Sequence, residues 1–250
     1  NIPALVCFCT KVDICEPVCD TLMVAFAAGG MNAQLPLCAI NPSTGQPKNC
    51  CNATGFADCP RTGFGVDLRL NSAKNRTDRP NEANVWPMTI AKIAAFKRPK
   101  KWKWNQSRDK LVEYGEGTPL RVSLYLQAVS KYDRGSEACN CNLTGEVNND
   151  YHLVLGRTKN AAEKYSLTAE ISPRIHRTNW THDRLKELAK QKAYVRVTGW
   201  AMLDTRHIGD KHPIRRTHWK IHPVTQLEVC TTTKSQCDTG TGWTPLEDLP

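Results

Sequence analysis

LRVSLYL, residues 120–126, opens the stretch that decides the fold, Pro119 to Cys230. Its apolar side chains recur at every second position, which is the period of a half-buried strand. Four further strands and one helix are expected at Tyr151–Leu155, Ser166–Ile171, Thr181–Lys190 (the helix), Tyr194–Trp200 and His218–Val229. Three strands, a helix and two strands is the order of an OB-like five-stranded Greek-key barrel. The sequence therefore predicts a mainly β fold with short helices, in the order β-β-β-α-β-β.

The helix of this barrel has a recognisable start and an apolar face. Thr181 is the expected N-cap, because its hydroxyl can accept a hydrogen bond from a free N–H of the first turn. Leu185 and Leu188 lie three residues apart, so they share one face of the helix. That face is expected to cover the open end of the barrel.

The barrel divides the rest of the chain into flanking segments. Residues 1–60 form a Cys-rich N-terminal region or arm, with a short helix expected over Cys15–Ala28. Residues 61–118 are expected to be a connector packed on the barrel, with a short helix or strand at Thr89–Phe96. The barrel spans 119–230, and residues 231–250 form a C-terminal tail.

Twelve Cys indicate a disulfide framework: Cys7, Cys9, Cys15, Cys19, Cys38, Cys50, Cys51, Cys59, Cys139, Cys141, Cys230 and Cys237. Structural zinc is the alternative, but it usually uses paired C-x2-C knuckles, whereas the spacings here are C-x-C, C-x3-C and C-C. Disulfides imply an oxidising compartment, so the chain is expected to be secreted. A bridge between Cys230 and Cys237 is the one pairing predicted individually.

Five N-x-[ST] triplets point to the same compartment, at Asn52, Asn75, Asn105, Asn142 and Asn179. If these sites carry glycans, each Asn lies on the surface of a secreted glycoprotein. The longest apolar run, Leu22–Ala28, is too short to cross a membrane, so no membrane span is expected.

The formal net charge is +10, and one loop concentrates basic and aromatic side chains: Lys97, Arg98, Lys100, Lys101, Trp102, Lys103 and Trp104. Basic residues interleaved with Trp can contact a nucleic-acid backbone and stack on bases. The alternative is a loop whose Trp rings dock on the barrel while the Lys stems extend along the surface. An anionic polymer is therefore one expected partner.

Polar side chains at the strand ends form the candidate site. His152, Asp204, His207 and His222 are the candidate ligands of a divalent metal, because imidazole and carboxylate together suit zinc and related ions. Alternation places His218, Lys220 and His222 on one face of the last strand. The alternative is a set of core histidines bonded to nearby carboxylates. Glu170, Arg174, Arg215 and Arg216 are also available for phosphodiester chemistry, but their spacing matches no known motif.

Several segments resemble a family of uncharacterised secreted bacterial proteins with an OB-like barrel, over about residues 70–230. The similar segments are Lys74–Asp78, Asp150–Leu153, Glu170–Arg174, Arg196–Trp200 with Asp204 and His207, and Trp219–Val224. The resemblance implies the barrel fold and brings no established activity with it.

The sequence lacks the common catalytic signatures: G-x-S-x-G, a P-loop, H-E-x-x-H and a Gly-rich dinucleotide loop. The first hypothesis is therefore a secreted, non-catalytic binding or assembly protein, whose Cys-rich arm docks on further copies in an oligomer or filament and which needs no cofactor. The alternatives are a metal-assisted phosphodiesterase or nuclease, and an OB module that binds nucleic acid or anionic glycan.

Overall fold

The structure is a computed structural model of the chain. It describes residues 56, 59–63, 67–103, 105–130, 137–209 and 214–250, so the helix expected at Cys15–Ala28 lies outside the described residues. The chain divides into two compact units: 1–75 with 104–106 and 134–149, and 76–103 with 107–133 and 150–250. Each unit is described by itself.

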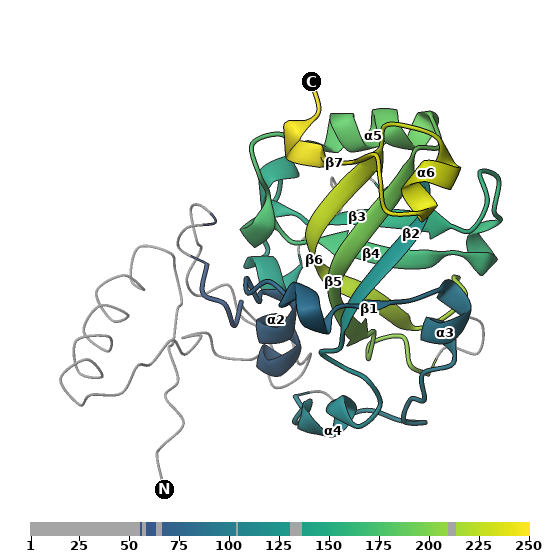
Figure 1. The fold of residues 1–250 in the computed structure, drawn as a ribbon. Helices are drawn as coiled ribbons and strands as arrows, with labels where there is room; N and C mark the ends of the chain where they lie inside the picture. Colours follow the sequence, from purple (N-terminus) through teal and green to yellow (C-terminus); the bar gives the residue numbers. More distant parts are fainter. Residues whose placement is uncertain (1–55, 57–58, 64–66, 104, 131–136, 210–213) are drawn as a thin grey trace, which may run out of the picture. The chain divides into compact units, whose positions relative to one another are not determined.

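The larger unit is a closed barrel of five strands (Figure 1): β2 (Pro119–Val129), β3 (Tyr151–Gly156), β4 (Leu167–Ile171), β5 (Tyr194–Leu203) and β6 (Trp219–Cys230). The strand order is β2-β3-β4-β6-β5, and pairing of β5 with β2 closes the barrel. β4 and β6 run parallel, and the other barrel pairs are antiparallel. The structure confirms the predicted mainly β fold with a five-stranded barrel and short helices.

The barrel closes around one apolar core. Along β2, Leu120, Val122, Leu124 and Leu126 are buried, while the residues between them are partly exposed. This period of two leaves one face of the strand in the core and the other outside. The same alternation in β3, β4 and β6 supplies further core residues, including Leu153, Leu155, Ala169, Ile171, Trp219 and Ile221.

Helix α5 (His182–Lys190) lies across one end of the barrel (Figure 1) and confirms the predicted helix. The Thr181 hydroxyl accepts from the backbone N–H of Arg184 at 3.2 Å, as expected of the N-cap. Leu185 is fully buried in the core and Leu188 packs against it, so the predicted apolar face covers this end.

Shorter elements of the connector complete the larger unit: η2 (Glu82–Asn84), β1 (Trp86–Pro87), α3 (Ile90–Ala94) and α4 (Asp109–Val112). The segment expected at Thr89–Phe96 to be a helix or a strand contains the helix α3, whose Ile90 and Ile93 join the barrel core. No helix in the described part of the chain is long and apolar enough to cross a membrane. The barrel loops also contain η5 (Glu163–Tyr165), η6 (Pro173–Ile175) and η7 (Leu246–Asp248).

In the basic loop, the ring of Trp102 packs against the core while the neighbouring Lys101 and Lys103 are exposed. The guanidinium of Arg98 donates to the backbone oxygen of Ile208 at 2.8 Å. Trp102 therefore follows the alternative in which the Trp rings of this loop dock on the barrel. Trp104 lies outside the described residues.

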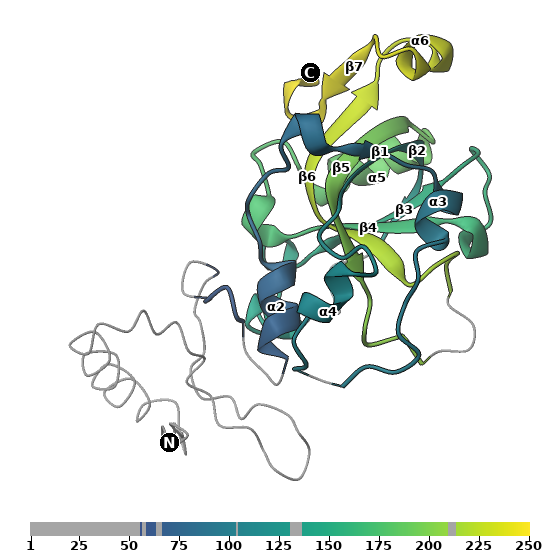
Figure 2. The ribbon, with the colours of Figure 1, turned by 60° about the horizontal axis from the view of Figure 1, so that its bottom comes forward.

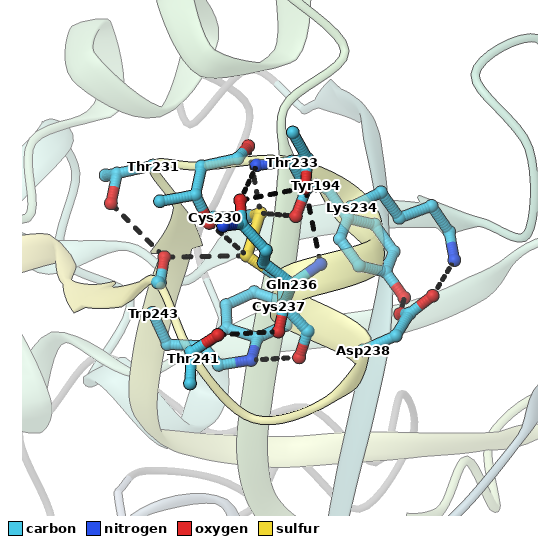
Figure 3. The surroundings of a disulfide bond; sticks show 12 residues. Tyr194, Cys230, Thr231, Thr233, Lys234, Gln236, Cys237, Asp238, Thr241 and Trp243 are labelled. Carbon is cyan, nitrogen blue, oxygen red and sulfur yellow. Dashed lines mark hydrogen bonds and ion pairs between the residues drawn. A yellow bond between two sulfur atoms is a disulfide. The ribbon is translucent and has the colours of Figure 1, made fainter.

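The C-terminal tail is held to the barrel by a disulfide and by aromatic contacts. β7 (Trp243–Pro245) pairs with the end of β6, and these strands project with α6 (Lys234–Asp238) from one side of the barrel (Figure 2). The predicted Cys230–Cys237 disulfide is confirmed (Figure 3). The Tyr194 hydroxyl donates to Asp238 at 2.7 Å, and burial together with this bond raises the pKa of Tyr194 to about 12.

The smaller unit contains α2 (Leu68–Lys74), η3 (Ala138–Asn140) and η4 (Glu146–Asn148). A disulfide joins Cys59 to Cys141, which confirms both as disulfide residues and, with Cys230–Cys237, indicates an oxidising environment. The predicted pairing of the seven Cys between residues 1 and 51 and of Cys139 stays a prediction.

Asn75 corrects one expectation about the five sequons. Its side chain is completely buried, and its amide nitrogen donates to the backbone oxygens of Arg61 and Cys139 at 3.0 and 2.6 Å. The prediction of a surface position is therefore wrong at Asn75, because a short polar side chain paired with two carbonyls is stable in an interior. Glycosylation of the other four stays a prediction: Asn105 is exposed, Asn142 and Asn179 are partly exposed, and Asn52 lies outside the described residues.

Gly199 lies where β5 and β6 approach closely, at an irregularity in their pairing. A Cβ atom there would lie 2.4 Å from the backbone oxygen of Pro223 and 2.6 Å from the Ile221 side chain. We expect Gly199→Ala to lower the free energy of unfolding by about 1–3 kcal/mol, because backbone on both strands would have to move. Urea denaturation with the disulfides intact measures the change.

Gly209→Ala is the matched control for this substitution. No described atom lies within 4 Å of a Cβ built there, so a change within about 0.5 kcal/mol is expected. Equal losses from the two substitutions would contradict the close approach of β5 and β6.

Candidate functional site

A row of polar side chains crosses three neighbouring strands of the barrel. His152 of β3 lies directly opposite Glu170 of β4, and Thr168 of β4 lies beside Lys220 of β6. These positions alternate with core residues such as Ala169, so their side chains project from the face opposite the core. Because these strands pair with one another, their alternating polar positions form one polar face, although the segments lie far apart in the sequence.

Glu170 is the centre of this row. Both of its carboxylate oxygens accept from the ammonium of Lys220, at 2.9 and 2.8 Å. Nδ1 of His222 lies 2.5 Å from Oε2, and Nε2 of His152 lies 3.8 Å from Oε1. On the far side of His222, Nε2 lies 3.7 Å from a carboxylate oxygen of Asp150. Three basic side chains thus surround one carboxylate that is only 3% exposed.

These neighbours determine the charge of Glu170. Burial by itself would raise the pKa of this carboxyl, because desolvation disfavours the charged form. The charges of Lys220, His152 and His222, with the hydrogen bond from His222, outweigh burial and hold the pKa of Glu170 well below its ordinary value. Glu170 is therefore a fixed buried anion at neutral pH.

A pocket of about 220 Å³ opens over this row. Its walls come from the polar faces of β3, β4 and β6 and from the segments that join β5 to β6. The lining residues are His152, Thr168, Glu170, Asp204, His207, Ile214, Arg215, Thr217, His218, Trp219 and Lys220. Three imidazoles, a guanidinium and two carboxylates therefore meet at one concave surface.

Three of the four predicted site residues, His152, Asp204 and His207, line this pocket. The fourth, His222, lies behind it, 1% exposed and bonded to Glu170. His222 is therefore a buried histidine bonded to a carboxylate, which is the alternative that the sequence left open. The predicted common face of His218, Lys220 and His222 is confirmed for Lys220 and His222, which both contact Glu170.

Two residues that the structure makes central, Glu170 and Arg215, were expected only as groups available for phosphodiester chemistry and were not among the four candidate ligands. A charged side chain at an alternate position of an otherwise apolar strand was the signal for Glu170. Arg215 carried no such signal, because it lies in a loop and reaches the site through the Thr168 hydroxyl, at 2.7 Å, and through Glu163, at 2.9 Å.

Asp150, Glu170 and His222 form a buried group whose residue types could hold a metal ion. One ligand atom from each residue lies within 4.8 Å of the others. However, Lys220 already occupies both oxygens of Glu170, so a divalent ion would replace or repel a buried ammonium. This group of three residues therefore does not fit a resident metal. In the described part of the chain, His152, Asp204 and His207 belong to no such converging group.

Two buried hydrogen-bond donors, on residues that contribute to the pocket lining, lack an acceptor. Nε of Arg215 and Nε1 of Trp219 are buried and have no partner among the described residues. A buried donor left unsatisfied costs about 1–3 kcal/mol, so such atoms are uncommon. Both oxygens of Glu170 are already engaged by Lys220 and His222, so Glu170 satisfies neither of these donors.

Comparison of the chain with protein-family models, with curated proteins and with solved structures finds no match.

Proposed function

We propose that this chain is a secreted binding protein with an OB-like barrel, whose pocket binds the anionic group of a ligand. The observation that carries the proposal is the set of basic side chains that line the pocket, Arg215, Lys220 and three histidines. Sulfate supplies only acceptors, and phosphate supplies more acceptors than donors, so either anion complements basic side chains that donate N–H groups.

The size and charge of the pocket support the same ligand class. About 220 Å³ is below the 300–1,000 Å³ typical of sites that enclose a drug-sized molecule. It suits one tetrahedral anion, with the rest of the ligand lying outside. Lys220 is paired with the buried Glu170, whereas Arg215 is paired with Glu163, whose side chain is 52% exposed. Because the exposed pair is the weaker one, Arg215 is the cation that a ligand can share more easily.

The strand order supports the OB-like assignment. Numbered within the barrel alone, the strands are paired 1-2-3-5-4, with strands 3 and 5 parallel and strands 4 and 1 closing the circle. OB barrels use one outer face and its neighbouring loops to bind oligonucleotides and oligosaccharides. The pocket lies on such an outer face, next to the segments that join β5 to β6.

Assembly into an oligomer or filament is a separate proposal, since most of the Cys-rich segment 1–60 lies outside the described residues. Its support is the density of Cys in that segment, which favours a stapled arm able to dock on another copy. A metal-assisted phosphodiesterase has less support, because Lys220 competes with an ion for Glu170.

Calorimetric titration of the full-length protein with inorganic phosphate and with sulfate tests the anion site. We expect Arg215→Met to weaken binding by about 10-fold or more, because a charge-assisted hydrogen bond is worth roughly 1.5–3 kcal/mol. Arg157→Met is the matched control: Arg157 is an exposed arginine of the same unit that does not line the pocket. No binding of either anion, or equal affinity in the two variants, would overturn the proposal.

A further inference from the structure

We infer that the ligand whose anionic group enters the pocket is a sulfated polysaccharide, and that its chain continues from the pocket onto the basic segment Lys97–Lys103. This inference rests on the proposed anion site and names the partner that the site takes. It is carried by the contact between an exposed basic segment and the loop that lines the pocket.

The segment Lys97–Lys103 concentrates positive charge on the surface, and it contains no acidic residue. Its exposed cationic side chains are those of Lys97, Arg98, Lys100, Lys101 and Lys103. In the described part of the chain, none of these side chains forms an ion pair with a carboxylate. Like charges held this close together repel one another, and a polyanion that binds to them relieves the repulsion.

The fold holds the start of this segment against the loop that lines the pocket. The ring of Phe96 packs edge-on against the ring of Trp219, with centroids 5.5 Å apart. The guanidinium of Arg98 donates to the backbone oxygen of Ile208 at 2.8 Å, and Ile208 directly follows His207 of the pocket lining. The positive charge of the segment therefore begins beside the pocket.

Trp102 holds the far end of the segment. Its ring packs against the core, whereas the neighbouring Lys101 and Lys103 are exposed. The two ammonium groups therefore extend from a backbone that is anchored between them. A segment that is already ordered loses less conformational entropy when it binds a ligand.

The size of the pocket favours a ligand that extends beyond it. A volume of about 220 Å³ suits one tetrahedral anion, and the exposed Arg216 lies next to Arg215 of the lining. A small anion would fill the pocket and leave the basic segment without a partner. A chain with repeated anionic groups can place one group in the pocket and others along the segment, and linked contacts of this kind strengthen each other.

Two observations favour a sulfated polysaccharide over a nucleic acid. Single-stranded nucleic acids usually stack their bases on aromatic side chains. Among the described residues of this segment, Trp102 carries the one aromatic ring, and that ring packs against the core. In addition, the disulfides indicate an oxidising environment of the kind found outside cells, where sulfated polysaccharides occur.

Calorimetric titration of the full-length protein with heparin oligosaccharides at about 0.1 M salt tests the inference. We expect a heparin octasaccharide to bind about 10-fold or more tightly than a heparin disaccharide, because the disaccharide reaches only one of the two cationic regions. Removing the sulfate groups from the octasaccharide should weaken its binding about 10-fold or more, because the sulfates are the groups that the cations contact.

Replacing Lys101 and Lys103 together by Gln should weaken octasaccharide binding about 10-fold and change the affinity for inorganic phosphate less than about twofold. The slope of log Kd against log salt concentration should fall by about two, one for each lost contact. Replacing Lys186 and Lys190 of α5 by Gln is the matched control, since both are exposed, neither lines the pocket, and the net charge changes equally. The control should change octasaccharide affinity less than about threefold.

Arg215→Met connects the polysaccharide to the pocket. This variant should weaken the binding of the octasaccharide as well as that of phosphate, because one sulfate of the chain occupies the pocket. An effect on phosphate alone would overturn the inference, because the polysaccharide would then bypass the pocket.

The other outcomes separate the two proposals. Equal affinity for the disaccharide and the octasaccharide, equal losses in the two double variants, or undiminished binding after desulfation would each overturn the polysaccharide inference and leave the anion site standing. Tighter binding of single-stranded DNA with the same number of charges would also overturn it and assign the surface to nucleic acid. Absence of phosphate and sulfate binding would overturn both proposals.

Discussion

Replacing Lys220 by Met is expected to lower the free energy of unfolding at pH 7 by about 3–5 kcal/mol. The ammonium of Lys220 and the carboxylate of Glu170 are 9% and 4% exposed, and they are joined by two hydrogen bonds. Met fills a similar volume, so the loss comes mainly from the charge of Glu170, which stays buried without its closest cation. Breaking a buried pair in this way is costlier than replacing both partners.

The pH dependence follows from the lowered pKa of Glu170. Since the folded pKa lies below the ordinary value of 4.5, ionised Glu170 stabilises the fold above about pH 4.5. That contribution is lost as the pH falls through the folded pKa. Without Lys220, the largest lowering influence on the pKa of Glu170 is lost, so that pKa moves upward and the carboxyl accepts a proton more readily in the folded state. The difference between the two proteins should therefore be largest near neutral pH and shrink below about pH 4.5.

Urea denaturation with intact disulfides, at pH 7 and at pH 4, measures both effects. Lys190→Met is the matched control: Lys190 pairs with Glu187 on the helix surface, and their side chains are 73% and 56% exposed. Exposed pairs contribute little, so a change below about 0.5 kcal/mol is expected. A loss of similar size in the two variants, or one independent of pH, would contradict the buried pair.

The second large effect is expected from Trp219→Ala, with a loss of about 3–5 kcal/mol. Trp219 is 1% exposed, and its ring meets that of Phe96 edge-on, with centroids 5.5 Å apart and an interplanar angle of 85°. It begins β6 and joins the connector to the barrel core. Removing the ring opens a cavity that the surrounding strands cannot fill without losing their pairing.

Two further Trp variants sharpen this prediction. Trp219→Phe retains most of the buried ring and removes an N–H that has no acceptor among the described residues, so its loss should be less than half as large. Trp86→Ala removes a ring that is 59% exposed and should change stability by about 0.5 kcal/mol or less. Thermal or urea unfolding ranks the three variants. A Trp86 effect as large as that of Trp219 would be incompatible with the burial assigned to each ring.

Sequence reasoning succeeded where one local rule decides the outcome. Alternation at Leu120–Leu126 located the first barrel strand, and the Thr181 cap with Leu185 located the helix. The short spacing of Cys230 and Cys237 sufficed for their pairing. Sequence reasoning failed at Asn75, because a sequon is a pattern of only three residues. The burial of Asn75 depends on carbonyls supplied by Arg61 and by Cys139, which is 64 positions away.

The candidate site was predictable only in part for the same reason. Residue type and strand position suffice to nominate His152, Asp204 and His207, which line one pocket. They do not reveal that Glu170 and Lys220 are partners, because that depends on β4 and β6 being neighbours although 50 residues separate the two. Nor do they distinguish His222, buried against Glu170, from an accessible ligand.

The sequence by itself determined the elements of this protein: the alternating strands, the capped helix, the oxidising environment implied by its cysteines, and the polar positions on the last strand. These depend on the period of side chains along a strand or helix and on spacing within a few residues. Only the tertiary structure decided which strands are neighbours, that β4 and β6 run parallel, and that three basic side chains enclose one carboxylate. Strand neighbours and buried charge pairs arise when the barrel closes, and the free energy of a charge depends on everything packed around it.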